Sequence, residues 1–191
     1  MSQFYEQQVP EEQISILKEL LNQIKPRYAI EIGSWMGNTT WPIAEECERN
    51  GGFVVCVDTW EGNVGTHLEP IASTYDVFKM FRDNVKAKKP RNIIPIMTDS
   101  LNVHFFKHGF FDFAFLDGDH RYSHVKSDIE ICWKALRKGG LICGHDMDVP
   151  TWDERWIEKD FVDGAHHGVI KAVTESFPDF SCHNPIWWRK K

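Results

Sequence analysis

Two short segments rich in aspartate and histidine are the part of this sequence where reactive side chains are most concentrated. The first reads DGDH at positions 117–120, and the second reads HDMD at positions 145–148. Each follows a short apolar run, as expected where a buried strand ends. Crowded carboxylates repel one another unless a cation, a proton or an arginine neutralises them, and hard oxygen ligands favour magnesium, manganese or calcium. The two segments therefore predict a divalent-cation site.

A plainer interpretation of the same two segments stays open. In it, Asp119 and Asp148 cap helices, and backbone groups at the strand ends satisfy His120 and His145.

A glycine-rich turn follows the first apolar run and reads EIGSWMGNT at positions 31–39. Pro42 then marks the first turn of a helix, so backbone N–H groups at this point can receive an anion. A dinucleotide-binding turn needs a second glycine close to the pyrophosphate, and Trp35 stands in that place. The turn therefore favours the small carboxylate of S-adenosylmethionine over a pyrophosphate. A tight turn without any ligand is the alternative.

Acidic residues also close the second and third apolar runs. Asp58 can accept hydrogen bonds from a ribose diol, a geometry that serves NAD and S-adenosylmethionine alike. Asp99 and Ser100 can meet the edge of an adenine ring. The alternatives are a solvated carboxylate at Asp58 and an ordinary turn or helix cap at Asp99 and Ser100.

The alternation of short apolar runs with amphipathic stretches predicts a doubly wound α/β fold with helices on both faces of a mostly parallel sheet of six or seven strands. Expected strands lie at 28–33, 53–58, 93–98, 111–117 and 141–145. Expected helices lie at 11–24, 123–137 and 169–177, with a terminal antiparallel pair within 180–190. Residues 61–73 show no period and predict a loop over the site. We expect one domain over 1–191, with a cofactor-binding core at 28–148 and a C-terminal part at 149–191.

Composition narrows the classes of partner. The 191 residues carry 22 basic and 28 acidic side chains, a net charge of -6. This charge gives no broad positive electrostatic field that would attract the phosphates of a nucleic acid, so we expect no nucleic-acid partner. No apolar run approaches the length that spans a bilayer, so we expect neither a membrane segment nor a membrane partner, and a cytoplasmic protein. The five cysteines form no C-x-x-C pair and predict buried, reduced thiols. The exposed edges of a short sheet make a homodimer plausible.

The combined motifs resemble the class I methyltransferases. They are EIGxxxG at 31–37, VDTWEG at 57–62, LDGDHxY at 116–122 and GGxxxGHD at 139–146. Within that class, the sequence looks similar to the group of macrocin and other sugar O-methyltransferases and cephalosporin hydroxylase-like proteins. The resemblance implies a Rossmann-like methyltransferase sheet and S-adenosylmethionine as cofactor. The cofactor site that it implies comprises Glu31, Gly33, Ser34, Gly37, Asn38, Thr39, Asp58, Thr59, Asp99, Ser100 and Asp117.

Catechol-type methyltransferases are similar too, with two departures. They carry Asp-Asn where this chain has His145-Asp146, and a lysine base where this chain has His120. The resemblance therefore implies a magnesium, manganese or calcium ion held by Asp117 and Asp146, with His145 a further candidate ligand. Asp117 and His120 become the candidate catalytic residues, with His120 as a general base that a neighbouring cation keeps neutral.

These features predict metal-assisted O-methylation of a small hydroxylated acceptor, either a sugar or a phenol-like compound. Residues 61–73 and 147–164, with Trp152 and Trp156, are expected to shape the acceptor pocket. Two rivals remain: a nicotinamide-dependent oxidoreductase, and a cofactor-binding partner protein without catalysis.

Overall fold

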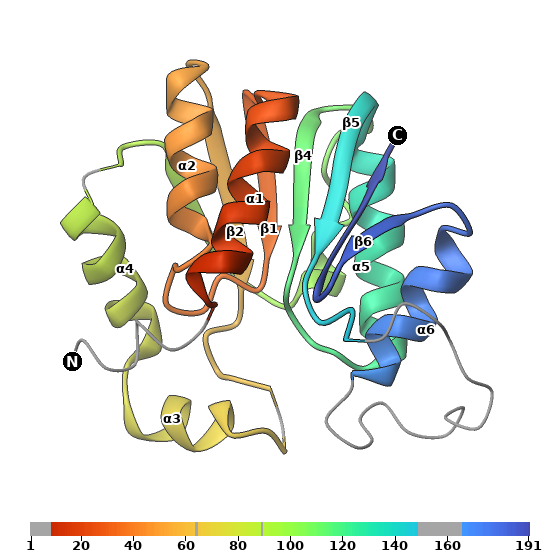
Figure 1. Ribbon diagram of the computed structural model, residues 1–191. Helices are drawn as coiled ribbons and strands as arrows, with labels where there is room; N and C mark the ends of the chain where they lie inside the picture. Colours follow the sequence, from red (N-terminus) through yellow and green to blue (C-terminus); the bar gives the residue numbers. More distant parts are fainter. Residues whose placement is uncertain (1–8, 64, 89, 149–165) are drawn as a thin grey trace.

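A twisted sheet with helices on both faces forms the centre of the molecule (Figure 1), in a computed structural model that describes residues 9–63, 65–88, 90–148 and 166–191. The strands are β1 Tyr28–Ile32, β2 Phe53–Asp58, β3 Ile93–Met97, β4 Phe111–Leu116, β5 Leu136–Gly144, β6 Ser181–His183 and β7 Ile186–Lys190. The helices are α1 Glu11–Ile24, α2 Thr40–Arg49, α3 Leu68–Thr74, α4 Val77–Lys88, α5 Tyr122–Ala135 and α6 His167–Ser176, with a 3-10 turn, η1, at Ser100–Asn102.

The seven strands are arranged in the order β3-β2-β1-β4-β5-β7-β6. The first five run parallel, whereas β7 pairs antiparallel with both β5 and β6. Because the order reverses between β1 and β4, their carboxyl ends border the crevice in which this kind of sheet binds ligands. The predicted doubly wound fold is confirmed, with seven strands and the terminal antiparallel pair.

Alternate strand residues supply two hydrophobic cores, one on each face of the sheet. In β1, Ala29 packs toward α1, α2 and α4, whereas Ile30 and Ile32 pack toward α5 and α6. This alternation follows from the two-residue period of a strand, and it makes the strands apolar throughout because both faces are covered. Trp187 of β7 is 1% exposed and packs in the core between the sheet and the helices α5 and α6.

Three predicted boundaries are wrong. Residues 68–74 form α3 instead of a loop, and this short helix buries none of its residues, so the sequence shows no apolar period there. The helix predicted to reach residue 137 ends at Ala135, because Leu136 leaves it to pair with Phe111. That pairing also starts β5 five residues earlier than the predicted position 141.

Four of the five cysteines are buried, as predicted, and one is not. All five cysteines are free, and Cys182 alone among them is not buried. No helix in the described ranges is long and apolar enough to cross a membrane.

Candidate active site

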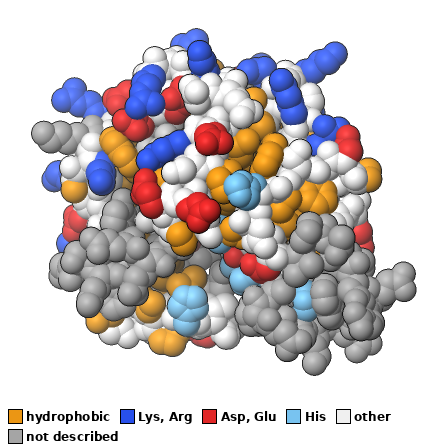
Figure 2. Space-filling view, in the orientation of Figure 1, with side chains coloured by type: hydrophobic (Ala, Val, Ile, Leu, Met, Phe, Trp, Pro, Cys, Tyr) orange, Lys and Arg blue, Asp and Glu red, His pale blue; other side chains and the backbone are white. Residues whose placement is uncertain are grey.

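The candidate site lies at the carboxyl ends of the parallel strands, the lower edge of the sheet in Figure 1. Seen from outside, acidic and histidine side chains gather at a hollow below the sheet (Figure 2). Two adjoining cavities open there, of about 220 and 490 Å³. We call them the cofactor cavity and the acceptor cavity.

The cofactor cavity is bordered by the ends of β1, β2 and β4 and by η1. Six of the predicted cofactor residues line it: Gly33, Asp58, Thr59, Asp99, Ser100 and Asp117. The Asp99 carboxylate also caps η1 by accepting a hydrogen bond from the Leu101 backbone N–H at 2.8 Å. The predicted adenine and ribose residues therefore lie around one cavity.

The acceptor cavity is lined by three more of the predicted cofactor residues and by the candidate chemical groups. Its walls include the turn residues Ser34, Asn38 and Thr39 and the candidate chemical groups Asp117, His120, His145 and Asp146. Asp117, Gly118 and Gly33 line both cavities, so the end of β4 is the partition between them.

Glu31 and Gly37, two further predicted cofactor residues, line neither of these two cavities. Glu31 is fully buried beneath the turn, where its carboxylate accepts hydrogen bonds from the hydroxyls of Ser34, Thr39 and Thr40. Burial raises the pKa of Glu31 against the opposing effect of these bonds. Glu31 therefore supports the turn from beneath through these three hydroxyl groups.

Asp58 is held by the backbone of two tryptophans. One carboxylate oxygen accepts the Trp35 N–H at 2.7 Å, and the other accepts the Trp60 N–H at 2.6 Å. The Trp60 indole in turn donates to the Trp35 carbonyl at 2.7 Å. Burial raises the pKa of Asp58, and these backbone bonds oppose that rise. Each carboxylate oxygen has a second lone pair, so Asp58 can still accept a ribose hydroxyl.

The first turn also packs tightly against the end of β4. A Cβ atom on Gly33 would lie 2.1 Å from the carbonyl oxygen of Asp117, and the Gly33 φ is +84°. Both facts require glycine at this position. The buried indole Nε1 of Trp35, beside the same turn, has no hydrogen-bond partner within the described ranges. A buried donor without a partner is costly.

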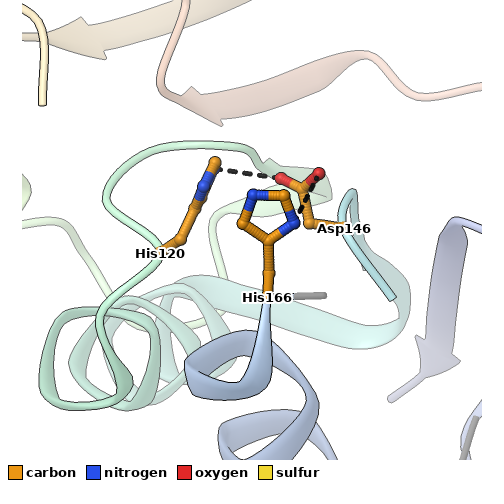
Figure 3. Close-up of side chains that lie close together, drawn as sticks. All are labelled: His120, Asp146 and His166. Atoms are coloured by element: carbon orange, nitrogen blue, oxygen red, sulfur yellow. Dashed lines mark ion pairs between the residues drawn. The ribbon is translucent and has the colours of Figure 1, made fainter. Parts of the chain in front are cut away.

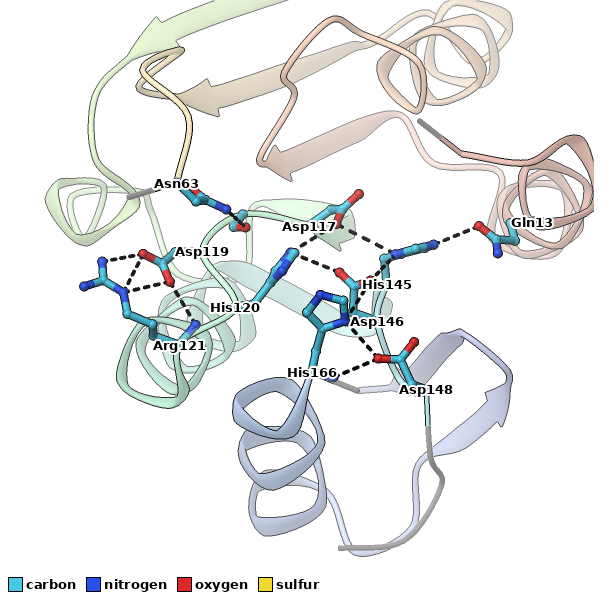
Figure 4. A network of polar contacts seen from close by, with 11 residues as sticks. Gln13, Asn63, Asp117, Asp119, His120, Arg121, His145, Asp146, Asp148 and His166 are labelled. Atoms are coloured by element: carbon cyan, nitrogen blue, oxygen red, sulfur yellow. Dashed lines mark hydrogen bonds and ion pairs between the residues drawn. The ribbon is translucent and has the colours of Figure 1, made fainter. Parts of the chain in front are cut away.

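Asp117, His120 and Asp146 form the centre of the acceptor cavity (Figure 4). His120 Nε2 lies 3.0 Å from Asp146 Oδ2 and 3.7 Å from Asp117 Oδ1. Asp119 lies apart from this group, because Arg121 binds its carboxylate through both the backbone N–H and the guanidinium. The first acidic segment therefore contributes one aspartate to the centre, not two.

The two carboxylates favour the protonated form of His120, and the neutral His120 beside a bound cation stays a prediction. Burial lowers its pKa, but hydrogen bonds and charges from Asp117 and Asp146 outweigh burial and raise the pKa to about 10. The sequence does not show that both carboxylates contact the same imidazole. For Asp146, burial acts to raise the pKa, yet His120 and His145 hold it well below its usual range.

His145 spans the cavity wall between β5 and α1. Its Nδ1 lies 2.8 Å from Asp146 Oδ1 and 4.0 Å from Asp117 Oδ1. Its Nε2 lies 2.8 Å from the amide oxygen of Gln13. Burial lowers the pKa of His145, but Asp117 and Asp146 outweigh it and raise the pKa to about 9.

His166 brings a further imidazole to the centre, from the residue that precedes α6 (Figure 3). Its Nδ1 lies 3.4 Å from Asp146 Oδ1 and 2.8 Å from Asp148 Oδ2. Its ring packs edge-on against the ring of His120, with the two ring centroids 4.6 Å apart. Asp148 also accepts the His166 backbone N–H at 2.9 Å, so it fixes the chain that enters α6.

Two sets of side chains place their ligand atoms within 4.8 Å of one another. The first set is the predicted one, Asp117, His145 and Asp146, and the second is His120, Asp146 and His166. Carboxylate oxygens and imidazole nitrogens are suitable ligands for a divalent cation. The predicted metal residues therefore meet in space, and the donor set fits a cation.

Gln13, Asn63 and His166 are parts of the site that the sequence motifs do not identify. Asn63 donates to the Gly118 carbonyl at 3.0 Å and ties residues 61–63 to the end of β4. Gln13 and His166 stand far from the motifs along the chain, and their roles depend on where α1 and α6 pack. Trp152 and Trp156, expected beside the acceptor, lie outside the described residues.

Comparison with known proteins agrees with this geometry. Residues 30–147, more than half of the chain, match a family described as a methyltransferase domain. The chain belongs to this methyltransferase family. With the seven-stranded fold, this match confirms the predicted class I S-adenosylmethionine-dependent methyltransferase. No curated protein matches the sequence of this methyltransferase.

Solved structures share the fold at low sequence identity. A putative caffeoyl-CoA O-methyltransferase from Staphylococcus aureus has a TM-score of 0.68 and 15% identity, covering 96% of this chain and 85% of its own. The SAH-bound methyltransferase PaMTH1 of Podospora anserina has a TM-score of 0.67 and 14% identity, covering 96% and 80%. An O-methyltransferase from Bacillus cereus in complex with SAH has a TM-score of 0.62 and 17% identity, covering 96% and 83%.

Proposed function

We propose that this methyltransferase transfers the methyl group of S-adenosylmethionine to a hydroxyl group of a small acceptor, with a divalent cation beside the cofactor. One observation carries the proposal: Asp117 lines both cavities, so the same strand end borders the donor and the acceptor. Methyl transfer needs a nucleophile aligned about 3 Å from the methyl carbon more than it needs covalent help from the protein.

The similar structures support the type of acceptor atom. The proteins from Staphylococcus aureus and Bacillus cereus are named as O-methyltransferases, the former as a putative caffeoyl-CoA enzyme. Two of the three structures described above contain SAH. Their acceptors do not transfer to this chain at such low identity, so we propose O-methylation and leave the acceptor class as sugar or phenol-like.

In this proposal the chain's own residues bind and orient the two substrates. Asp58 receives the ribose, Asp99 and Ser100 border the adenine, and the turn at 33–39 holds the amino acid end. The acceptor cavity has apolar walls at Leu68 and Ile71 opposite the polar centre, which suits a ring that carries hydroxyl groups.

His120 is the proposed general base, because it lies on the acceptor side of Asp117. In the observed pairing its proton is stabilised by two carboxylates, so the imidazole accepts a proton only when those charges are compensated. A divalent cation on Asp117 and Asp146 would supply that compensation and lower the pKa of an acceptor hydroxyl. His145 is the third proposed ligand.

Two measurements test this function. Calorimetry should show that S-adenosylmethionine and its demethylated product bind more tightly than NAD, because Trp35 stands where a pyrophosphate turn needs glycine. Tighter binding of NAD would favour an oxidoreductase instead. Methyl transfer should then be assayed against sugars and phenols with and without a chelator.

Chelation should abolish turnover, and an added divalent cation should restore it. Full activity in excess chelator would remove the metal from the proposal. Cofactor binding without transfer to any sugar or phenol would favour a non-catalytic partner protein.

A further inference from the structure

Gln13 is the residue of α1 that reaches the polar centre, and it does so from outside the motifs. It contacts His145, not the carboxylates, and its amide oxygen accepts from Nε2 at 2.8 Å. An amide oxygen accepts a hydrogen bond and cannot donate one, so the proton of a neutral His145 must sit on Nε2. The lone pair then sits on Nδ1, the nitrogen that faces Asp117 and Asp146.

This arrangement is the one by which proteins prepare histidines for metal ligation. A ligating imidazole usually donates its second ring N–H to an outer acceptor, which fixes the ring and the tautomer. Here the outer acceptor is Gln13, and the inward Nδ1 lies 2.8 Å from Asp146 Oδ1 and 4.0 Å from Asp117 Oδ1.

We propose that Gln13 positions His145 as a nitrogen ligand beside Asp117 and Asp146, and that the site thereby selects a transition-metal ion such as Mn²⁺, Co²⁺ or Zn²⁺ over Mg²⁺. The proposal rests on the proposed cation site. Imidazole suits zinc, iron and other transition metals, whereas magnesium prefers oxygen ligands and keeps several waters.

The second candidate set, with His120 and His166, fits a cation less well. The His166 nitrogen that faces Asp146 is Nδ1, and Asp148 already lies closer to that same nitrogen, at 2.8 Å against 3.4 Å. That set also has one carboxylate to neutralise the ion, whereas the set with His145 has two. We therefore assign His145 to the ion.

The test uses the full chain freed of metal by a chelator. Co²⁺ is titrated and followed by its visible d–d absorption, and Mg²⁺ and Mn²⁺ are titrated by calorimetry. Co²⁺ should bind at least about 10-fold more tightly than Mg²⁺. Gln13→Ala should weaken Co²⁺ about 10- to 100-fold, the usual effect of losing an outer partner, and should change Mg²⁺ affinity little.

Three variants make the assignment specific. Gln13→Glu keeps an acceptor for Nε2–H and should restore Co²⁺ affinity, whereas Gln23→Ala, at an exposed position of the same helix, should change nothing. His145→Asp should lose Co²⁺ selectivity while it retains Mg²⁺, because all three ligands become carboxylates.

Equal affinity for Co²⁺ and Mg²⁺ would overturn the proposal, as would a cobalt spectrum unchanged by Gln13→Ala. Loss of the cobalt spectrum in His166→Ala but not in His145→Ala would also overturn it. SAH binding, measured on the same samples, distinguishes a failure of this inference from a failure of the proposed function. If SAH binds and transition metals show no preference, this inference fails and the cofactor assignment stands, whereas failure to bind SAH contradicts the proposed function.

Discussion

The segments around the proposed cofactor and the polar centre of the acceptor cavity hold their carboxylates with different partners. On the cofactor side, Glu31 beneath the turn at 33–39 and Asp58 at the end of β2 are paired with neutral hydroxyl and backbone N–H donors, and burial raises the pKa of both. In the acceptor cavity, His120 and His145 outweigh burial and hold the pKa of Asp146 well below its usual range, whereas burial outweighs the same two histidines at Asp117 and raises its pKa.

This difference indicates two kinds of organisation at one sheet edge. The cofactor side is preorganised by hydrogen bonds within short segments, so its shape depends on backbone geometry. The acceptor side depends on charge pairs between side chains from several elements, so a bound cation or acceptor can rearrange it. Variants on the cofactor side should therefore lose stability or SAH affinity, whereas variants on the acceptor side should lose turnover.

The largest effect is expected from Glu31→Ala on the cofactor side. Loss of the buried carboxylate leaves the hydroxyls of Ser34, Thr39 and Thr40 without their common acceptor. The free energy of unfolding should fall by roughly 3 to 5 kcal/mol, since each unpaired buried polar group costs about 1–3 kcal/mol. Urea denaturation measures the loss.

Glu31→Gln is the matched control, because it retains one acceptor oxygen and should fall between the parent and Glu31→Ala. A Glu31→Ala protein as stable as the parent would show that the turn does not depend on Glu31. The contrast between the two cavities would then lose its main support.

On the acceptor side, His120→Ala should reduce turnover about 10²-fold, the usual contribution of a general base. SAH affinity should stay nearly constant, because His120 lines the acceptor cavity and not the cofactor cavity. Turnover and calorimetry are measured on the same preparation.

His108→Ala, at an exposed histidine, is the control for loss of an imidazole and should leave turnover unchanged. A loss of only a few fold in His120→Ala would reject the base. A matching loss of cation affinity would instead identify His120 as a ligand.

A smaller effect is expected from Asp58→Ala, on the cofactor side. The variant loses the ribose acceptor and also frees the backbone N–H groups of Trp35 and Trp60. SAH binding should weaken by roughly 1 to 3 kcal/mol, the range for hydrogen bonds to a charged group. Cation affinity should not change, so calorimetry with SAH and with the cation distinguishes an effect on the cofactor cavity from an effect on the acceptor cavity. Unchanged SAH affinity would contradict the ribose assignment.

The same contrast explains what the sequence could predict. The strand ends, the turn at 31–39 and the fold itself follow from local patterns, since apolar runs and glycine spacing act within short segments. Asp117 and Asp146 could be predicted to meet because their strands are neighbours in this architecture. The partnership of His145 with Gln13 could not, because it depends on how α1 packs 132 positions away along the chain. The pairing of His120 with both carboxylates likewise depends on side-chain directions that spacing does not show.

Asp128 of α5, a buried carboxylate near Ser100, tests whether burial keeps a carboxylate neutral at this edge of the sheet. It is 3% exposed, its Oδ1 has no hydrogen-bond partner among the described residues, and burial raises its pKa to about 7. Ser100 opposes this rise, whereas the charges of Asp99 and Asp119 add to it. The folded protein therefore binds a proton at Asp128 at pH values where the unfolded chain has lost it.

The sign of the pH dependence follows from that proton. Between about pH 4, where an unfolded aspartate titrates, and about pH 7, the folded state binds more protons, so the contribution of Asp128 to stability falls as pH rises. Asp128→Asn cannot ionise and should exceed the parent by roughly 1 to 3 kcal/mol at pH 8, with little difference near pH 4. Urea denaturation of both proteins across this range measures the difference, with Asp83→Asn as an exposed control. A difference that does not change with pH would mean that Asp128 is ionised in the folded state, and that burial alone does not keep this carboxylate neutral.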